Sequence, residues 1–175
     1  MGDSAIWIAV LTAGTAIGAS WVTSRGNADA ARVQAEASAA AQRAATHQDR
    51  MRAAHLAFIE QINAMGDLYR KVPTILGMKS LTEREAALAQ HLEEMRTGYG
   101  EFHRQINVVT LDGRRSSQPA ADAVHAASTH VYKTLQAIAD GTRNASDFGP
   151  AVSAYWKTAT AFIHAARESG QEPPG

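Results

Sequence analysis

The sequence predicts an all-α protein with an N-terminal transmembrane helix, a helical stalk and an antiparallel four-helix bundle. An uncharged apolar segment opens the chain, and an Ala-rich segment follows it. The remainder carries four segments in which apolar residues recur at alternating spacings of four and three, which is typical of helices with one buried face. The predicted division is an anchor over 1–26, a stalk over 27–49, a bundle over 50–170 and a disordered tail over 171–175.

Residues 5–23 are the predicted membrane span. They contain no charged residue, and as a helix they would be about 28 Å long, close to the hydrocarbon thickness of a bilayer. Trp7 and Trp21 stand near the two ends, where indole rings favour the membrane interface. The alternatives are a cleaved signal peptide, for which residues 1–4 lack basic charge, and a buried core helix, which rarely runs this long without a charge.

The flanking charges predict how the span is oriented. No Lys or Arg precedes it, whereas Arg25, Arg32 and Arg43 follow, so the N-terminus is expected outside and the bundle in the cytoplasm. Inside the span, Gly14 and Gly18 form a Gly-x-x-x-Gly pattern that lets two helices approach closely in lipid. Self-association into a homodimer and a lone anchor are both compatible with this pattern.

The segment behind the span is expected to start a new helix at Gly26 and Asn27. Its first half, with Val33 and a stripe of Ala, predicts a stalk or an Ala-faced coiled coil. Its second half gains large apolar residues that face a core, and Pro73 is expected to end the helix at Val72. These apolar residues are Met51, Phe58, Ile62, Met65, Tyr69 and Val72.

Three further helices complete the predicted bundle, and short connections between them favour antiparallel neighbours. The second opens with a capping box at Ser80–Glu83 and ends at Asp112-Gly113. The third follows a polar loop over 114–118 and stops at Gly141, and the fourth runs from near Asp147 to Gly170. The expected inward residues are Leu88, Leu92, Met95, Tyr99, Phe102, Ile106, Val109, Ala121, Val124, Ser128, Val131, Leu135, Ile138, Phe148, Val152, Tyr155, Ala159, Phe162, Ile163 and Ala166.

Composition argues against several classes of function. The 17 Lys and Arg balance 17 Asp and Glu, so no net field recruits nucleic acid. The chain has no Cys, which removes disulfides, thiolate metal sites and a Cys nucleophile. Nucleophile elbows, phosphate-binding Gly loops and dinucleotide fingerprints are absent from the sequence. The chain is therefore not expected to be an enzyme, and no catalytic residue and no cofactor are expected.

Seven His residues raise the question of a metal site. No Glu precedes a His by three positions, and no two His are four positions apart, so neither a ferritin-like nor a single-helix site is expected. His55 and His91, beside the apolar seams, are interpreted as hydrogen-bonded boundary residues. The spacings that do place two groups on one helix face, interpreted as surface pairs, are His91/Glu94, Asp122/His125 and His164/Glu168.

Two segments, Arg52–Ile59 (RAAHLAFI) and Phe162–Arg167 (FIHAAR), carry a resemblance to known proteins. With them, the chain resembles uncharacterised actinobacterial single-pass membrane proteins that have an Ala/Arg-rich stalk and a helical bundle. Those proteins often have Tyr where this chain has His55, and Asp-Leu-Gly where it has residues 168–170. The resemblance covers nearly the whole chain and implies this architecture without implying an activity.

The expected function is that of a membrane-anchored helical scaffold or protein-interaction module on the cytoplasmic side of the cell membrane. Its expected partners are the lipid bilayer, a second copy of the chain and a protein of unknown identity, but not nucleic acid. The alternative is an extracytoplasmic ligand-sensing or envelope-spanning (phage-lysis-like) bundle, which needs the reverse topology.

Overall fold

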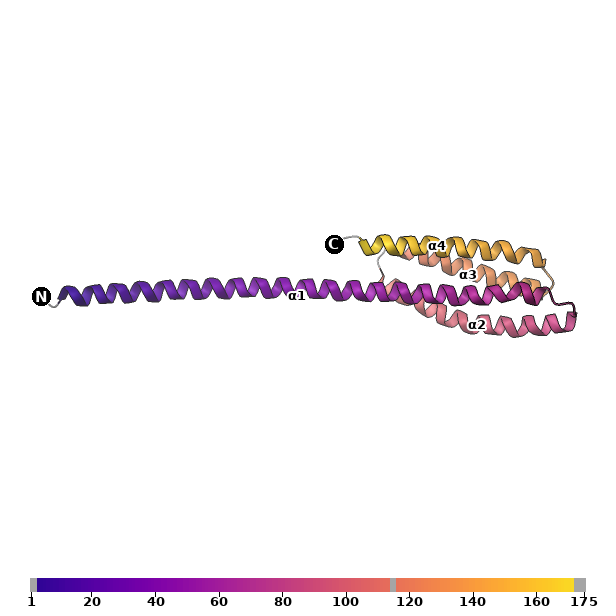
Figure 1. Cartoon of the computed structure of the whole chain (residues 1–175), viewed down its shortest axis with the longest axis horizontal. Helices are drawn as coiled ribbons and strands as arrows, with labels where there is room; N and C mark the ends of the chain where they lie inside the picture. The colour runs from indigo at the N-terminus through magenta and orange to yellow at the C-terminus, as the bar shows by residue number, and fades with distance from the viewer. Residues whose placement is uncertain (1–2, 114–115, 172–175) are drawn as a thin grey trace. The chain divides into compact units, whose positions relative to one another are not determined.

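The structure, a computed structural model, describes the backbone of residues 3–113 and 116–171 and the side chains of residues 27, 29–111, 113 and 116–170. This part of the chain contains helices α1 (Asp3–Leu76), α2 (Leu81–Asp112), α3 (Gln118–Ala139) and α4 (Phe148–Gln171), with a 3-10 turn, η1 (Ala145–Asp147), before α4 (Figure 1). None of its residues lies in a strand. The all-α prediction is confirmed.

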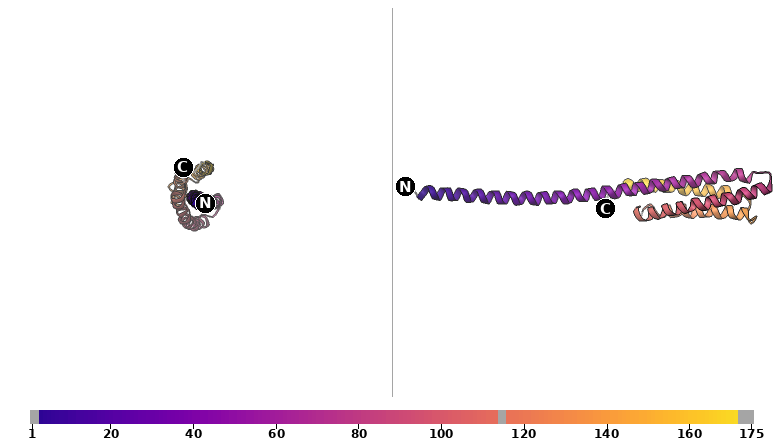
Figure 2. Two further views of the ribbon diagram at one scale, coloured as in Figure 1. Left: turned by 90° about the vertical axis from the view of Figure 1, so that its left-hand side faces the viewer. Right: turned by 90° about the horizontal axis from the view of Figure 1, so that it is seen from below.

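The chain divides into two compact units, Met1–Thr46 and His47–Gly175. The second unit is a four-helix bundle made of the end of α1 together with α2, α3 and α4, which lie side by side in Figures 1 and 2. Side-chain contacts give the directions of the helices. Phe58 and Phe102 are in ring contact and Leu68 contacts His91, so α1 and α2 run antiparallel.

Further contacts place the other two helices around α1. Residue numbers rise together in α1 and α3, because Tyr69 bonds Ser128 and His55 bonds Ser117 just before α3 begins. The pairing of α1 with α4 is antiparallel, since Tyr155 bonds Ile62 while Phe162 packs on Phe58. This is the up-and-down arrangement that short connections between helices predict.

Aromatic side chains fill the middle of the bundle. The ring centres of Phe58 and Phe162 are 4.8 Å apart and those of Tyr69 and Tyr155 are 5.0 Å apart, both in edge-to-face arrangements. Each of these four residues is at most 1% exposed. The apolar residues predicted to face inward from the four helices are all buried or half-buried. The spacing of apolar residues therefore predicted the buried face of every bundle helix.

The two ends of α2 follow its local sequence. Ser80 is the N-cap, and its hydroxyl accepts a hydrogen bond from the backbone N–H of Glu83 at 3.3 Å. Gly113 is the C-cap, and its N–H donates to the carbonyl of Val109. Both predicted boundaries of this helix are confirmed, because each depends on side chains and backbone groups within one turn.

Two predicted boundaries in α1 are wrong. The helix passes through Gly26 and Asn27 without a break, because Gly in a helix costs only about 1 kcal/mol and the flanking Ala-rich sequence is strongly helix-forming. It also continues past Pro73 to Leu76. Pro73 lies in the last turn, where only one backbone hydrogen bond is lost, and Val72 before it is fully buried. Core packing therefore outweighs the local preference against helix before Pro.

In the first unit, the described side chains between residues 27 and 46 are exposed apart from Ala39 and Ala44, which are half-exposed. Val33, the largest apolar residue among them, is 66% exposed. Among the helices as far as they are described, none has an apolar stretch long enough to cross a membrane. The predicted span over 5–23 lies outside the residues whose side chains are described.

Candidate functional site

A hollow opens between the C-terminal end of α1 and the first half of α2. Its volume is about 340 Å³, and it is open to solvent. Apolar side chains form part of its wall, and polar and charged groups are available at its surface. Its lining residues are Lys71, Thr74, Ile75, Ala87, Gln90, His91 and Glu94.

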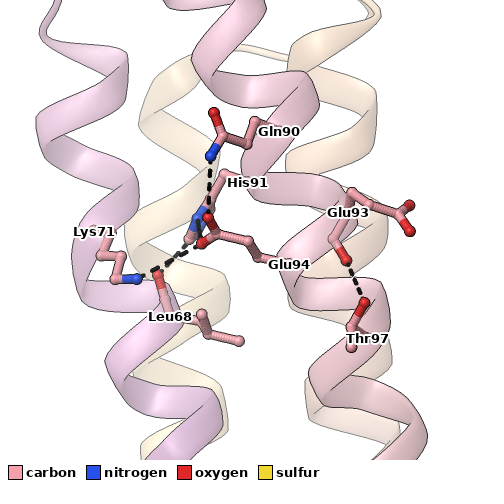
Figure 3. Close-up of polar contacts among 7 residues, drawn as sticks. All are labelled: Leu68, Lys71, Gln90, His91, Glu93, Glu94 and Thr97. Carbon is pink, nitrogen blue, oxygen red and sulfur yellow. Dashed lines mark hydrogen bonds and ion pairs between the residues drawn. The ribbon is translucent and has the colours of Figure 1, made fainter.

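His91 is the buried polar group of this hollow, with 3% of its surface exposed. Its Nε2 lies 2.9 Å from the carbonyl oxygen of Leu68 in α1, and its Nδ1 lies 3.3 Å from Oε2 of Glu94 one turn later in α2 (Figure 3). The Leu68 carbonyl can only accept, so Nε2 carries a proton and donates it. His91 thereby ties the two helices together.

Glu94 links this histidine to the charged surface. Its carboxylate lies 3.6 Å from Nζ of Lys71 and 3.5 Å from the amide nitrogen of Gln90. The hydrogen bond with His91, together with the charges of Lys71 and His91, lowers the pKa of Glu94 below its ordinary value, so this carboxylate is ionised at neutral pH. Figure 3 shows the Glu93 carboxylate turned away from this network.

The two hydrogen bonds of His91 depend on how many protons its ring carries. An ionised carboxylate only accepts, so a bond between Nδ1 and Glu94 requires a second proton on the ring. In that form His91 is an imidazolium held between a backbone carbonyl and a carboxylate. The hollow thus presents an ammonium, a carboxylate and an amide beside apolar wall residues, a surface suited to a polar side chain or small polar group.

A second buried histidine lies nearer the other end of the bundle. His55 is 5% exposed, its Nε2 lies 3.1 Å from the hydroxyl oxygen of Ser117, and its ring packs edge-on against Phe162. Burial lowers the pKa of His55 below its ordinary value, because a charged ring would lose its hydration there. Ser117 itself is fully buried. This contact joins α1 to the start of α3.

The structure places some of the residues singled out from the sequence, and others lie outside the described side chains. His55 and His91 are hydrogen-bonded at helix interfaces, as predicted, and the expected His91/Glu94 pair is in contact. The partners of His91 on α1 could not be predicted from spacing, because they belong to another helix. The proposed membrane residues Gly14, Gly18, Trp7 and Trp21 lie outside the described side chains.

Sequence reasoning also missed the burial of Ser117. Its neighbours are polar and the segment 114–118 is expected to be a polar loop, yet Ser117 contacts His55, which lies 62 positions earlier in the sequence. The one available signal was the apolar residue Ala121 one turn later, which marks the buried face of α3. Within the ranges 3–113 and 116–171, no three or more His, Asp or Glu side chains are placed to hold a metal ion together.

Comparisons with models of protein families, with curated proteins and with solved structures gave no match.

Proposed function

We propose that this chain is a membrane-anchored helical interaction module, with residues 5–23 in the bilayer and the bundle in the cytoplasm. The proposal includes membership of the actinobacterial group that the chain resembles. The observation that carries it is the exposed Ala-rich part of α1, residues 27–50, in which only two of the described side chains are even half-covered. A single helix of this composition separates or joins other elements, and it builds no core of its own.

Charge is distributed to one side of this segment. At 100° per residue, Asp29, Arg32, Glu36, Arg43 and Arg50 lie within a narrow stripe, and Asp49 is the exception. Between residues 30 and 48 the opposite side has no charged residue, so another helix can cover it there without desolvating an ion. That side is formed by Ala30, Gln34, Ala37, Ala41, Ala45 and Gln48. We propose a homodimer whose contact continues from Gly14 and Gly18 in the span along this side.

The hydrogen bonding of buried polar groups in the bundle supports a binding role at its surface. In the described residues, every buried side-chain nitrogen and oxygen has a hydrogen-bond partner. The polar groups that can bind a partner therefore lie on the surface of the bundle, as at the hollow beside His91. We propose that a protein partner docks there through a polar side chain that contacts Lys71 and Glu94.

Cysteine labelling tests the anchor and the topology together, because the natural chain has no Cys. Ser146→Cys marks the bundle at an exposed position of η1, and Ser4→Cys marks the N-terminal side of the predicted span. In intact cells, a membrane-impermeant maleimide is expected to label the Ser4→Cys variant and to spare the Ser146→Cys variant until the cells are opened. The reverse pattern would establish the extracytoplasmic alternative, and equal labelling of both variants would refute the anchor.

Self-association is tested separately in the membrane. Gly14→Ile and Gly18→Ile place bulky side chains where two helices would meet, and each is expected to abolish dimerisation in a transmembrane reporter assay. Thr12→Ile places the same Ile side chain on the other side of the helix and serves as the control. A wild-type span that stays monomeric, or a control that fails equally, would contradict the proposed Gly contact.

A further inference from the structure

A second polar cluster lies between α2 and α3, away from the hollow beside His91. The Tyr99 hydroxyl oxygen lies 2.6 Å from Nε2 of His125 and 2.6 Å from the hydroxyl oxygen of Thr129. Tyr99 and His125 are half-buried, and His103, one turn after Tyr99 on α2, is exposed. The sequence marked only Asp122 and His125 as a pair on one helix face, and the fold adds His103 beside them.

The hydrogen bonds of this cluster determine which nitrogen of His125 carries a proton. The Thr129 hydroxyl donates to the backbone carbonyl of His125 at 3.0 Å, so its oxygen must accept from Tyr99. Tyr99 has one proton and donates it to Thr129, so its oxygen accepts from Nε2–H of His125. In the neutral ring the other nitrogen, Nδ1, is then unprotonated and has a lone pair that can bind a metal ion.

The electrostatic surroundings favour the neutral form of the His125 ring. Burial lowers the pKa of His125 below its ordinary value, and the nearby His103 lowers it further, while Asp122 acts in the opposite direction. A ring nitrogen that donates to a neighbouring oxygen while the other nitrogen is free is the usual state of a histidine that binds a metal. Tyr99 therefore holds His125 in the tautomer and orientation that a metal ion requires.

His103 provides a second imidazole at a suitable separation. The ring centres of His103 and His125 are 5.2 Å apart, with 49° between the ring planes. Two imidazoles bound to one zinc ion through bonds of about 2.0–2.1 Å, in tetrahedral geometry, have ring centres about 5 Å apart. We propose that His103 and His125 form a two-histidine site for a divalent transition-metal ion such as Zn²⁺, with water completing its coordination.

This site goes beyond the proposed interaction module and does not depend on it. Its two protein ligands come from α2 and α3, so a bound ion would join these helices at their surface. Since both nitrogens must be unprotonated to bind, affinity is expected to fall as the pH is lowered from 7.5 to 6. Imidazole ligands favour Zn²⁺, Ni²⁺ and Cu²⁺ over Mg²⁺ and Ca²⁺, so the last two ions are expected not to compete.

The test is a Zn²⁺ titration of the full chain in detergent, in competition with a chromophoric zinc chelator. His103→Gln is expected to weaken the tightest Zn²⁺ site at least about tenfold, and Tyr99→Phe, which keeps both imidazoles but removes the oxygen that orients His125, is expected to weaken it by about tenfold. His130→Gln removes another exposed histidine of α3 and is the matched control, with unchanged affinity expected.

The fold of each variant is checked by its thermal unfolding midpoint without metal. His103 is exposed, so His103→Gln is expected to unfold as the wild type does. Equal Zn²⁺ affinity in the wild type and His103→Gln would overturn the site, and so would a wild-type chain that binds no Zn²⁺ at millimolar concentration. Loss of affinity in the His130→Gln control would also overturn it, because binding would then depend on a different histidine.

Discussion

Gly66 in α1 lies directly against the indole of Trp156 in α4: a Cβ atom built at Gly66 would be only 2.3 Å from Cζ2 of Trp156. The guanidinium of Arg70 lies on the same indole, 6.0 Å from the ring centre. The missing side chain at Gly66 therefore lets a half-buried Trp approach the backbone of α1 closely.

Gly66→Ala is expected to destabilise the bundle by about 1 kcal/mol, as measured by urea unfolding. The overlap with Trp156 costs about 1–3 kcal/mol, and the better helix propensity of Ala returns up to about 1 kcal/mol. In a Trp156→Ala background the same substitution has no clash and is expected to stabilise. Gly100→Ala, at an exposed site of α2 with nothing within 4 Å, is the control and should stabilise in either background. Stabilisation by Gly66→Ala in the wild-type background would show that the indole gives way freely.

The buried bond between Tyr69 and Ser128 is expected to show coupling in a double-mutant cycle. Their hydroxyl oxygens are 2.8 Å apart, and burial raises the pKa of Tyr69, so this hydroxyl stays protonated. Tyr69→Phe or Ser128→Ala leaves one buried hydroxyl without its partner, at a cost of about 1–3 kcal/mol, whereas the double variant leaves none. The double variant should therefore lose less stability than the sum of the single variants. Tyr132→Phe, at a half-exposed position, is the control, and strict additivity would contradict the coupling.

His55 is expected to make the bundle less stable in mild acid. Its pKa in the folded chain is lowered from the ordinary value of 6.5, so below that pH the unfolded chain takes up a proton that the folded chain resists. Stability is thus fully present above pH 6.5 and is lost as the pH falls toward the folded-state pKa. Thermal midpoints measured between pH 7.5 and 5 should show a shallower decline in His55→Gln than in the wild type. Some slope remains, because the pKa of His125 is lowered as well.

The control for this pH series is His164→Gln, which removes an exposed histidine instead of a buried one. Identical slopes in the wild type and His55→Gln would show that burial of this ring does not determine the acid response.

Ser80→Ala is expected to lower the free energy of unfolding by about 1 kcal/mol through loss of the N-cap of α2. The hydroxyl of Ser80 satisfies the N–H of Glu83, and Ala leaves that group to water. Ser153→Ala, at an exposed position within α4, removes a hydroxyl without touching a cap and should change stability by a few tenths of a kcal/mol at most. Equal effects of the two substitutions in urea unfolding would argue against the cap.

At the hollow beside His91, the sequence predicted only the contact between residues of the same helix. The spacing of His91 and Glu94 places them on one face of α2, and the structure shows them in contact. Their partners Leu68 and Lys71 belong to α1, and no local pattern relates the two segments. The proposed pairing of His103 on α2 with His125 on α3 could not be inferred from spacing for the same reason, since the two residues are far apart in sequence.

The sequence by itself determined that the chain is helical, where α2 begins and ends, and which side of each bundle helix is buried. These properties depend on caps and on a period of 3.6 residues, both of which act within a turn or two. The tertiary structure decided how far each helix extends along its neighbours, and with that the contacts of His91 with Leu68, of His55 with Ser117 and of Gly66 with Trp156. Periodicity fixes the rotation of a helix about its axis, but its shift along that axis is set by side chains that interlock with those of other helices. The extension of α1 past Pro73 has the same cause, because burial of Val72 among those helices outweighs a local preference.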